Sequence, residues 1–201
     1  MNDTRTEQPV VLVTGSTGFI GQALLRAIAP RCRVVGMDVV EPKDSIHHTD
    51  WFHCDLTEEQ SVQDCLGRVR EAYGKDIVSV FHLAAYYDFS GEPSEMYEKL
   101  TVEGTRRLVR ALKPFNVEQF VFSSSLLAMQ PVDDKEDRLT ESSPTRAEWD
   151  YPASKLEAEH VLRDEHGDMP VVVHRIAGVY NDECRSLPLS HHIQRIYEKS
   201  L

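Results

Sequence analysis

The segment TGSTGFIG, residues 14–21, constrains the fold of this chain more than any other stretch. It follows a short apolar run at residues 9–13 and opens an amphipathic segment that we expect to be helical over about residues 18–29. A glycine-rich turn between a buried strand and a helix gathers unpaired backbone N–H groups and the positive end of the helix dipole at one point. The sequence therefore predicts a phosphate-binding turn here.

The three glycines of the turn have different expected roles. Gly15 can take backbone angles closed to other residues, Gly18 leaves room for a pyrophosphate, and Gly21 lets the helix pack closely on the strand. On their own, three glycines at this spacing also fit an ordinary strand-to-helix turn. A second feature is therefore needed to identify a dinucleotide site.

That second feature is a carboxylate at the end of the next predicted strand. The β-branched run at residues 33–40 places Asp38 there, 23 positions after Gly15. At about this spacing a carboxylate accepts hydrogen bonds from ribose hydroxyls, although a surface aspartate ending a strand is the plain alternative. A carboxylate repels a 2′-phosphate, and neither the turn nor the two residues after Asp38 offers a Lys or Arg. We therefore expect NAD in preference to NADP.

Strand-like and helix-like segments alternate along the chain. Thr57 is predicted to cap a helix, with Gln60 completing a capping box. This alternation predicts an α/β fold of the Rossmann type, with a doubly wound parallel sheet, helices on both faces and ligands at the carboxyl ends of the strands. The predicted strands cover residues 9–13, 33–40, 51–55, 77–85, 118–124 and 169–176, and the later helices cover the stretch after residue 57 and residues 94–112 and 151–165.

A tyrosine and a lysine in YPASK indicate proton-transfer chemistry. Tyr151 and Lys155 stand at i and i+4, so they are neighbours on one helix face. A phenol with a pKa of about 10 is a poor base at neutral pH, and a nearby ammonium favours its ionised form. Ser125, at the end of a predicted strand, could hydrogen-bond the same substrate oxygen. Alone, this pair is more often a packed aromatic with a surface lysine; with the glycine turn and Asp38 it indicates a catalytic site.

Together these motifs resemble those of the extended short-chain dehydrogenases/reductases, also called the NAD-dependent epimerase/dehydratase family. TGSTGFIG is similar to the family's TGxxGFIG, and HLAA at residues 82–85 to its fourth-strand signature. FSSS at residues 122–125 and YPASKLEAE at 151–159 resemble its serine and YxxxK elements, and HRIAGVY at 174–180 its sixth-strand segment. The resemblance runs along nearly the whole chain and implies NAD as the cofactor.

The resemblance also implies roles for individual residues. Tyr151 would be the catalytic acid/base, Lys155 would tune it and hold the nicotinamide ribose, and Ser125 would be the catalytic serine. Ser123 would face the cofactor, whereas Ser124 should point to the other side of the strand. The expected cofactor-binding residues are Gly15, Thr17, Gly18, Phe19, Ile20, Gly21, Asp38, Asp55, Leu56, Leu83, Ala84, Ala85, Ser123, Tyr151, Lys155 and Ile176.

Two features depart from the family's usual pattern. Residues 101–105 read TVEGT where many members have an asparagine in NVxGT, and Thr101 lacks the amide's pair of donors. Family members usually continue into a small substrate-binding domain. We therefore expect residues 1–180 to form the NAD-binding domain and residues 181–201 to begin a truncated C-terminal substrate-binding region.

Composition narrows the partners. The net charge of −11 argues against a nucleic-acid or anionic membrane surface, since both need clustered Lys and Arg. No signal peptide or apolar run of membrane length is visible, so we expect a cytoplasmic protein. The four cysteines show no CxxC spacing, and no metal site is expected. The expected partners are a small-molecule substrate and, from the resemblance, a second copy packed through the helices at 94–112 and 151–165.

Three readings of function stay open. The first is an epimerase, dehydratase or oxidoreductase acting on a hydroxyl or keto group, with a nucleotide sugar as the commonest substrate among relatives. The second is an alcohol or steroid-type dehydrogenase, and the third is a non-catalytic NAD-binding regulatory protein. Substrate choice should depend on the loop at residues 86–92 and the insert at residues 128–149, together with the C-terminal region.

Overall fold

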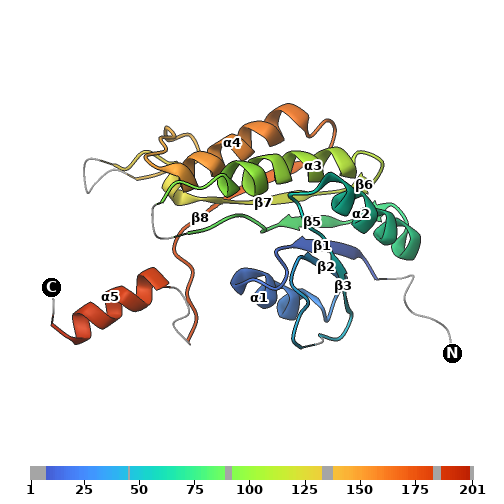
Figure 1. The fold of residues 1–201 in the computed structure, drawn as a ribbon, viewed down its shortest axis with the longest axis horizontal. Coiled ribbons are helices and arrows are strands. Elements are labelled where there is room, and N and C mark those ends of the chain that lie inside the picture. Colours follow the sequence, from blue (N-terminus) through green and yellow to red (C-terminus); the bar gives the residue numbers. More distant parts are fainter. Residues whose placement is uncertain (1–7, 45, 89–91, 133–137, 183–186, 200–201) are drawn as a thin grey trace.

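The computed structural model describes residues 8–44, 46–88, 92–132, 138–182 and 187–199. Its main sheet has six parallel strands in the order β3, β2, β1, β5, β7, β8 (Figure 1). The strand order therefore reverses between the neighbours β1 and β5, which confirms the predicted doubly wound sheet. The strands are β1 (Val10–Thr14), β2 (Arg33–Asp38), β3 (Thr49–His53), β5 (Ser79–His82), β7 (Phe120–Ser125) and β8 (Val171–Ile176).

Helices cover both faces of this sheet. Three of them, α2 (Glu59–Tyr73), α3 (Glu103–Leu112) and α4 (Asp150–Glu165), lie on one face, and α1 (Phe19–Ile28) lies on the other beneath β1 and β2 (Figure 1). The last helix, α5 (Leu187–Tyr197), stands away from the sheet at the end where β7 and β8 finish. Among the described residues, no helix is long and apolar enough to cross a membrane.

The core consists of two layers because each central strand is apolar on both sides. Along β1, Leu12 faces the layer beneath α2, α3 and α4, whereas Val11 and Val13 pack with Leu25 of α1. Successive strand residues point to opposite faces, so a continuous apolar run feeds both layers. The apolar runs in the sequence thus locate the central strands correctly.

The predicted cap at Thr57 is wrong. Helix α2 begins after Glu58 and has no side-chain cap hydrogen bond. The amide and hydroxyl of Thr57 both donate to Asp55 Oδ1, at 2.8 and 2.7 Å. A local Asx turn therefore takes the groups that a capping box would have used.

Two other predicted elements are interrupted. The strand expected at residues 77–85 is divided into two strands, β4 (Asp76–Ile77) and β5. Strand β4 pairs with β6 (Asn116–Val117). The amide of Val78, which follows β4, donates instead to Val10 O, so the chain changes its pairing partner there. The helix expected at residues 94–112 begins as a π-helix, Tyr97–Val102, before α3. Where the π-helix passes into α3, the Thr105 hydroxyl donates to Thr101 O at 2.6 Å. This hydrogen bond occupies a carbonyl that would otherwise accept only backbone amides of the helix.

Candidate cofactor and catalytic site

The glycine turn is folded so tightly that side chains are excluded from it. Gly15 has φ +65°, in the left-handed region that favours glycine, and a Cβ there would lie 2.8 Å from Ala84 N. A Cβ on Gly21 would lie 2.2 Å from Gly15 O, and one on Gly18 3.2 Å from the same oxygen. Gly18 caps α1 without a side-chain hydrogen bond. The first amides of α1, those of Phe19 and Ile20, therefore suit a phosphate group.

Asp38 lies against this turn, as its spacing predicts. Its Oδ2 accepts hydrogen bonds from the amide and hydroxyl of Thr17, at 3.0 and 2.9 Å, and its Oδ1 from the amide of Val40 at 3.3 Å. The side chain is half-exposed at the end of β2. A carboxylate has about four acceptor sites and three are used here, so about one remains for a ribose hydroxyl.

Asp55 and Leu56, both expected to bind the cofactor, differ in accessibility, since Asp55 is partly exposed. Leu56 is buried, and its backbone oxygen accepts a hydrogen bond from Arg107 Nη1 at 3.1 Å. The Asp55 carboxylate holds the turn before α2 through Thr57. Both follow β3 at the carboxyl edge of the sheet, on the same side of β1 as Asp38.

The end of β5 is held to the glycine turn by a buried chain of hydrogen bonds through His82. Thr105 Oγ1 donates to Thr101 O, so it must accept from His82 Nε2 at 2.9 Å. His82 Nδ1 then accepts from Thr14 Oγ1 at 2.7 Å, and Thr14 Oγ1 accepts the amides of Leu83 and Ala84 at 3.2 Å. These donors and acceptors are consistent only with the neutral Nε2–H tautomer.

Burial, together with the charge of Lys155, lowers the pKa of His82 to about 3. This histidine lies within the HLAA motif, but its role was missed because the two threonines that partner it come from distant segments. Thr101 has a second function: its Oγ1 accepts the Tyr86 amide at 3.0 Å. This hydroxyl therefore holds the loop after β5, at the position where many family members have an asparagine.

The three predicted catalytic residues meet where β7 ends beside the start of α4. Ser125 lies near enough to Tyr151 to influence the pKa of its phenol, and Ser125 Oγ accepts the Leu127 amide at 3.2 Å. Lys155 is buried, and its Nζ donates to Ser123 O at 2.7 Å. The same Nζ lies 5.9 Å from the centre of the Tyr151 ring. Ile176, at the end of β8, stands in register with Ser125.

Burial governs the proton affinities here. It raises the pKa of Tyr151 above its ordinary value, and Ser125 only partly opposes this. The net shift is therefore upward, opposite to the direction expected from the charge of Lys155 alone. Burial also lowers the pKa of Lys155 to about 7, although the negative charge of Glu159 acts in the opposite direction.

A partly buried ion pair joins α4 to β8. Arg175 of β8 donates from Nη2 to Glu159 Oε2 at 2.7 Å and from Nε to Oε1 at 3.1 Å. Ser124 donates to the same carboxylate. The alternation expected for Ser124 thus gives it a specific partner one helical turn below Lys155. The sequence did not predict that Glu159 and Arg175 pair. An ion pair between a helix and an edge strand joins residues of two separate elements, so no local sequence pattern indicates it.

The described part of the chain contains no cluster of side chains that could bind a metal ion. No group of three or more His, Cys, Asp or Glu side chains comes together there. The paired histidines at residues 47–48 and 191–192 are exposed. Cys184 lies outside the described residues.

The sequence of this chain is similar to those of several known enzymes. The chain is 28% identical over 160 residues to the N-acetyl-alpha-D-glucosaminyl-diphospho-ditrans,octacis-undecaprenol 4-epimerase of Escherichia coli O157:H7, a match that covers 80% of this chain and 44% of that protein. It is 32% identical over 133 residues to the dihydroflavonol 4-reductase of Gerbera hybrida, covering 57% and 33%. The chain thus spans less than half the length of either relative.

The fold matches solved structures over more of their length. WbmG of Bordetella bronchiseptica, crystallised with NAD, superimposes with a TM-score of 0.75 and 20% identity, covering 98% of this chain and 62% of that one. The sequence profile of the NAD dependent epimerase/dehydratase family matches residues 11–199. Because that match takes in nearly the whole chain, the protein belongs to the NAD dependent epimerase/dehydratase family.

Proposed function

We propose that this chain carries the cofactor site and the proton-transfer site of an NAD-dependent oxidoreductase that acts on a hydroxyl or keto group. The observation that carries the proposal is the position of buried Lys155, one turn along α4 from Tyr151. Its Nζ lies 5.9 Å from the centre of the Tyr151 ring and 2.7 Å from Ser123 O at the end of β7. This group lies at the same edge of the sheet as the glycine turn and Asp38.

The cofactor would be held along this edge. The first amides of α1 bind the pyrophosphate, Asp38 binds the adenosine ribose, and Asp55 with Leu56 contacts the adenine. When bound, NAD supplies the hydride acceptor or donor. The remaining contacts come from the ends of β5, β7 and β8, at Leu83, Ala84, Ala85, Ser123 and Ile176.

The chain's own residues move the proton. Tyr151 in its ionised form, which a positive charge bound beside it favours, accepts the proton of a substrate hydroxyl as the hydride leaves the adjacent carbon, and returns it in the reverse direction. Ser125 hydrogen-bonds the substrate oxygen and fixes its distance from the phenol. Lys155, with a pKa of about 7, is partly charged at neutral pH and responds readily to a new neighbouring charge.

Mutation of the phenol tests this proposal. Tyr151→Phe removes only the hydroxyl, so NAD affinity measured by calorimetry should stay within about twofold. NADH formation from a panel of secondary alcohols and UDP-glucose should fall about a hundredfold or more. Tyr197→Phe in α5, whose ring is exposed, is the matched control. Unchanged turnover in Tyr151→Phe would instead favour a non-catalytic or differently catalysed protein.

Release of NADH would separate the enzyme readings. An epimerase or dehydratase that keeps its reduced cofactor between half-reactions should accumulate little free NADH. A simple alcohol or steroid-type dehydrogenase should release one NADH for each alcohol oxidised. The measurement is the absorbance of free NADH after the protein has been filtered away.

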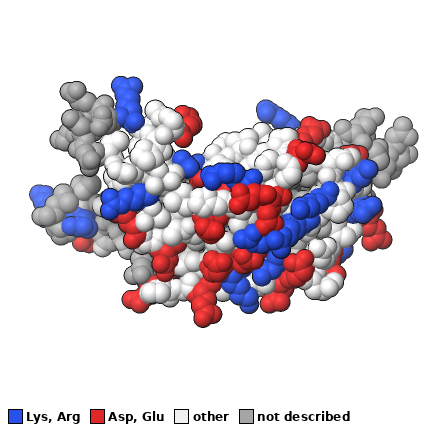
Figure 2. Space-filling model, turned by 90° about the horizontal axis from the view of Figure 1, so that it is seen from above, with Lys and Arg blue, Asp and Glu red and all other residues white. Residues whose placement is uncertain are grey.

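We also propose a homodimer through α3 and α4, as the family resemblance implies. Figure 2 shows Lys and Arg interspersed with Asp and Glu over this helical face. Arg106 and Arg110 of α3 already pair with Glu165 of α4 within the chain. Such an interface would be polar, and the dimer should therefore dissociate as salt rises. Sedimentation at low and high salt tests this; a monomer at low salt would contradict it.

A further inference from the structure

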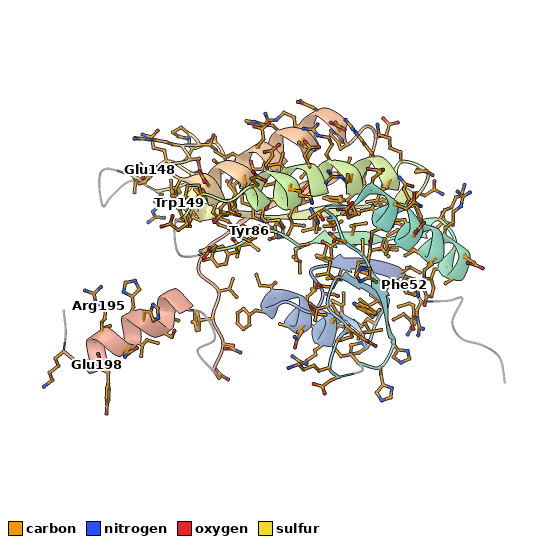
Figure 3. All side chains as sticks on the ribbon, viewed as in Figure 1. Phe52, Tyr86, Glu148, Trp149, Arg195 and Glu198 are labelled. Carbon is orange, nitrogen blue, oxygen red and sulfur yellow. The ribbon has the colours of Figure 1, made fainter. Side chains whose placement is uncertain are left out.

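An aromatic cluster surrounds the phenol of the proposed site. The centre of the Tyr151 ring lies 4.7 Å from that of Tyr87, 5.7 Å from that of Trp149 and 6.5 Å from that of Tyr97. Tyr86 packs edge-on against Tyr97 at 4.8 Å. Figure 3 shows Tyr86 and Trp149 at the same end of the molecule, near the start of α4. The loop after β5 and the insert before α4, both predicted to choose the substrate, thus meet at this cluster.

One ring of the cluster, that of Tyr97, is buried. Two others, those of Tyr87 and Trp149, are exposed and form the walls of the site. Tyr97 is 4% exposed, and its hydroxyl donates to Asp88 O at 3.2 Å, so it is part of the framework. Tyr87 is 48% exposed and Trp149 37%, which leaves ring surface for a ligand. Burial raises the pKa of Tyr87 to about 12, so this wall is an uncharged phenol at neutral pH.

Two exposed apolar side chains also follow the proposed catalytic serine. Leu126 and Leu127 follow Ser125 directly and are exposed, although leucine side chains are usually buried in a folded chain. Together with Tyr87 and Trp149 they place apolar surface next to the two proposed catalytic hydroxyls. A ligand with apolar ring surface gains from burying these groups and from stacking on the aromatic walls.

Charge around the cluster disfavours an anionic ligand. In the described segments 83–88, 123–132 and 146–155 the acidic residues are Asp88, Glu148 and Asp150, and the basic residues are Arg146 and the buried, partly charged Lys155. Arg146 pairs with Glu148 at 3.6 Å. The N-terminus of α4 would attract phosphate, but Asp150 in its first turn offsets that field. A diphosphate would therefore meet net negative charge.

We propose that the substrate is an uncharged alcohol or ketone borne on a ring system, which stacks against Tyr87 and Trp149, and that it is not a nucleotide sugar. The inference rests on the proposed function, since it names the substrate class of the same site. For an alcohol, the carbinol carbon gives a hydride to NAD and the hydroxyl gives its proton to Tyr151, which leaves the ketone. The apolar rings remain unchanged and provide the binding energy.

Two probes of opposite character test the substrate class. 1-Tetralol is a neutral bicyclic secondary alcohol, and UDP-glucose is a nucleotide sugar with a diphosphate. With NAD present, calorimetry should show 1-tetralol binding more tightly than UDP-glucose. Tyr87→Leu and Trp149→Leu should each weaken 1-tetralol binding about fivefold, through lost stacking, and should leave NAD affinity unchanged. Tyr197→Leu, a matched change in an exposed ring of α5, should alter neither.

The outcomes separate this inference from the proposed function. Tighter binding of UDP-glucose, no binding of 1-tetralol, or wild-type 1-tetralol affinity in both wall variants would each overturn the substrate class. None of these results touches the NAD affinity or the Tyr151 dependence of turnover. Loss of either of those two properties, with 1-tetralol still bound at the walls, would overturn the proposed function instead.

Discussion

The two halves of the proposed site are constructed differently. The β1–α1–β2 half is determined by backbone: a positive φ at Gly15, close approaches at Gly21, and amide groups at the start of α1. The β7–α4–β8 half is determined by side chains, because Lys155 and Glu159 are buried and hold the backbone or side chains of neighbouring strands. We therefore expect the first half to be sensitive to added volume and the second to lost charge or hydrogen bonds.

Added volume at the glycine turn should have the largest effect. In Gly21→Ala the new methyl would lie 2.2 Å from Gly15 O, so the turn must open and the first amides of α1 must move. NAD affinity should fall about a hundredfold or more, about 2.7 kcal/mol. Gly67→Ala in α2 is the control, because its Cβ meets nothing within 4 Å. Equal NAD affinity in both variants, measured by calorimetry, would remove the distinction between the halves.

Removal of the buried ammonium should change how stability depends on pH. The unfolded Lys155 keeps its proton up to its ordinary pKa of 10.5, whereas the folded protein releases it at about 7. Unfolding therefore takes up a proton in this window, and rising pH stabilises the fold by up to about 1.4 kcal/mol per pH unit. Below the window both states are protonated, and this contribution stops changing.

Lys155→Met should lack that dependence. The free energy of unfolding of the wild type, from urea titrations, should rise with pH relative to the variant between about 7 and 10.5. The variant should also bind NAD more weakly if Lys155 holds the nicotinamide ribose. A constant difference in unfolding free energy across this range would mean that the buried lysine keeps its charge, contrary to the pKa shift.

Cofactor choice should depend on Asp38. The wild type should bind NAD at least about tenfold more tightly than NADP, a difference of about 1.4 kcal/mol that one carboxylate–phosphate repulsion can supply. Asp38→Ala should narrow this gap. It also removes the acceptor of Thr17, so affinity for both cofactors should decrease. The check is calorimetry with each cofactor; equal or tighter NADP binding by the wild type would contradict the assignment.

The smallest expected effect concerns Ser124. Ser124→Ala removes one hydrogen bond to Glu159 and should lower the free energy of unfolding by about 1 kcal/mol. In a Glu159→Gln background, where the charged acceptor is absent, the same substitution should cost less. Strict additivity in this double-mutant cycle would show that the two side chains act independently.

The sequence alone located most of the first half. The glycine spacing, the β-branched run before Asp38 and the alternation of elements depend on interactions within about thirty residues, a separation that local patterns and strand-to-helix turns can encode. The wrong prediction after β3 was also local. Thr57 donates to Asp55 because a short polar side chain has competing backbone and side-chain partners within two positions.

The sequence predicted the β7–α4–β8 half of the site only in part. YPASK and FSSS identified Tyr151, Lys155 and Ser125, but nothing in the motif predicted that burial would raise the pKa of Tyr151. The direction of the hydrogen bonds through His82 likewise depends on threonines that come from separate elements. The sequence also did not predict the π-helix at Tyr97–Val102.

What the sequence determined by itself is the order of strands and helices, the glycine turn and the chemical identity of the proposed site. Those features follow from local backbone propensities and from apolar periodicity. The tertiary structure alone decided the proton affinities and the aromatic walls at Tyr87 and Trp149. Desolvation and ring contacts depend on which distant segments pack together, and that information appears only once the chain has folded.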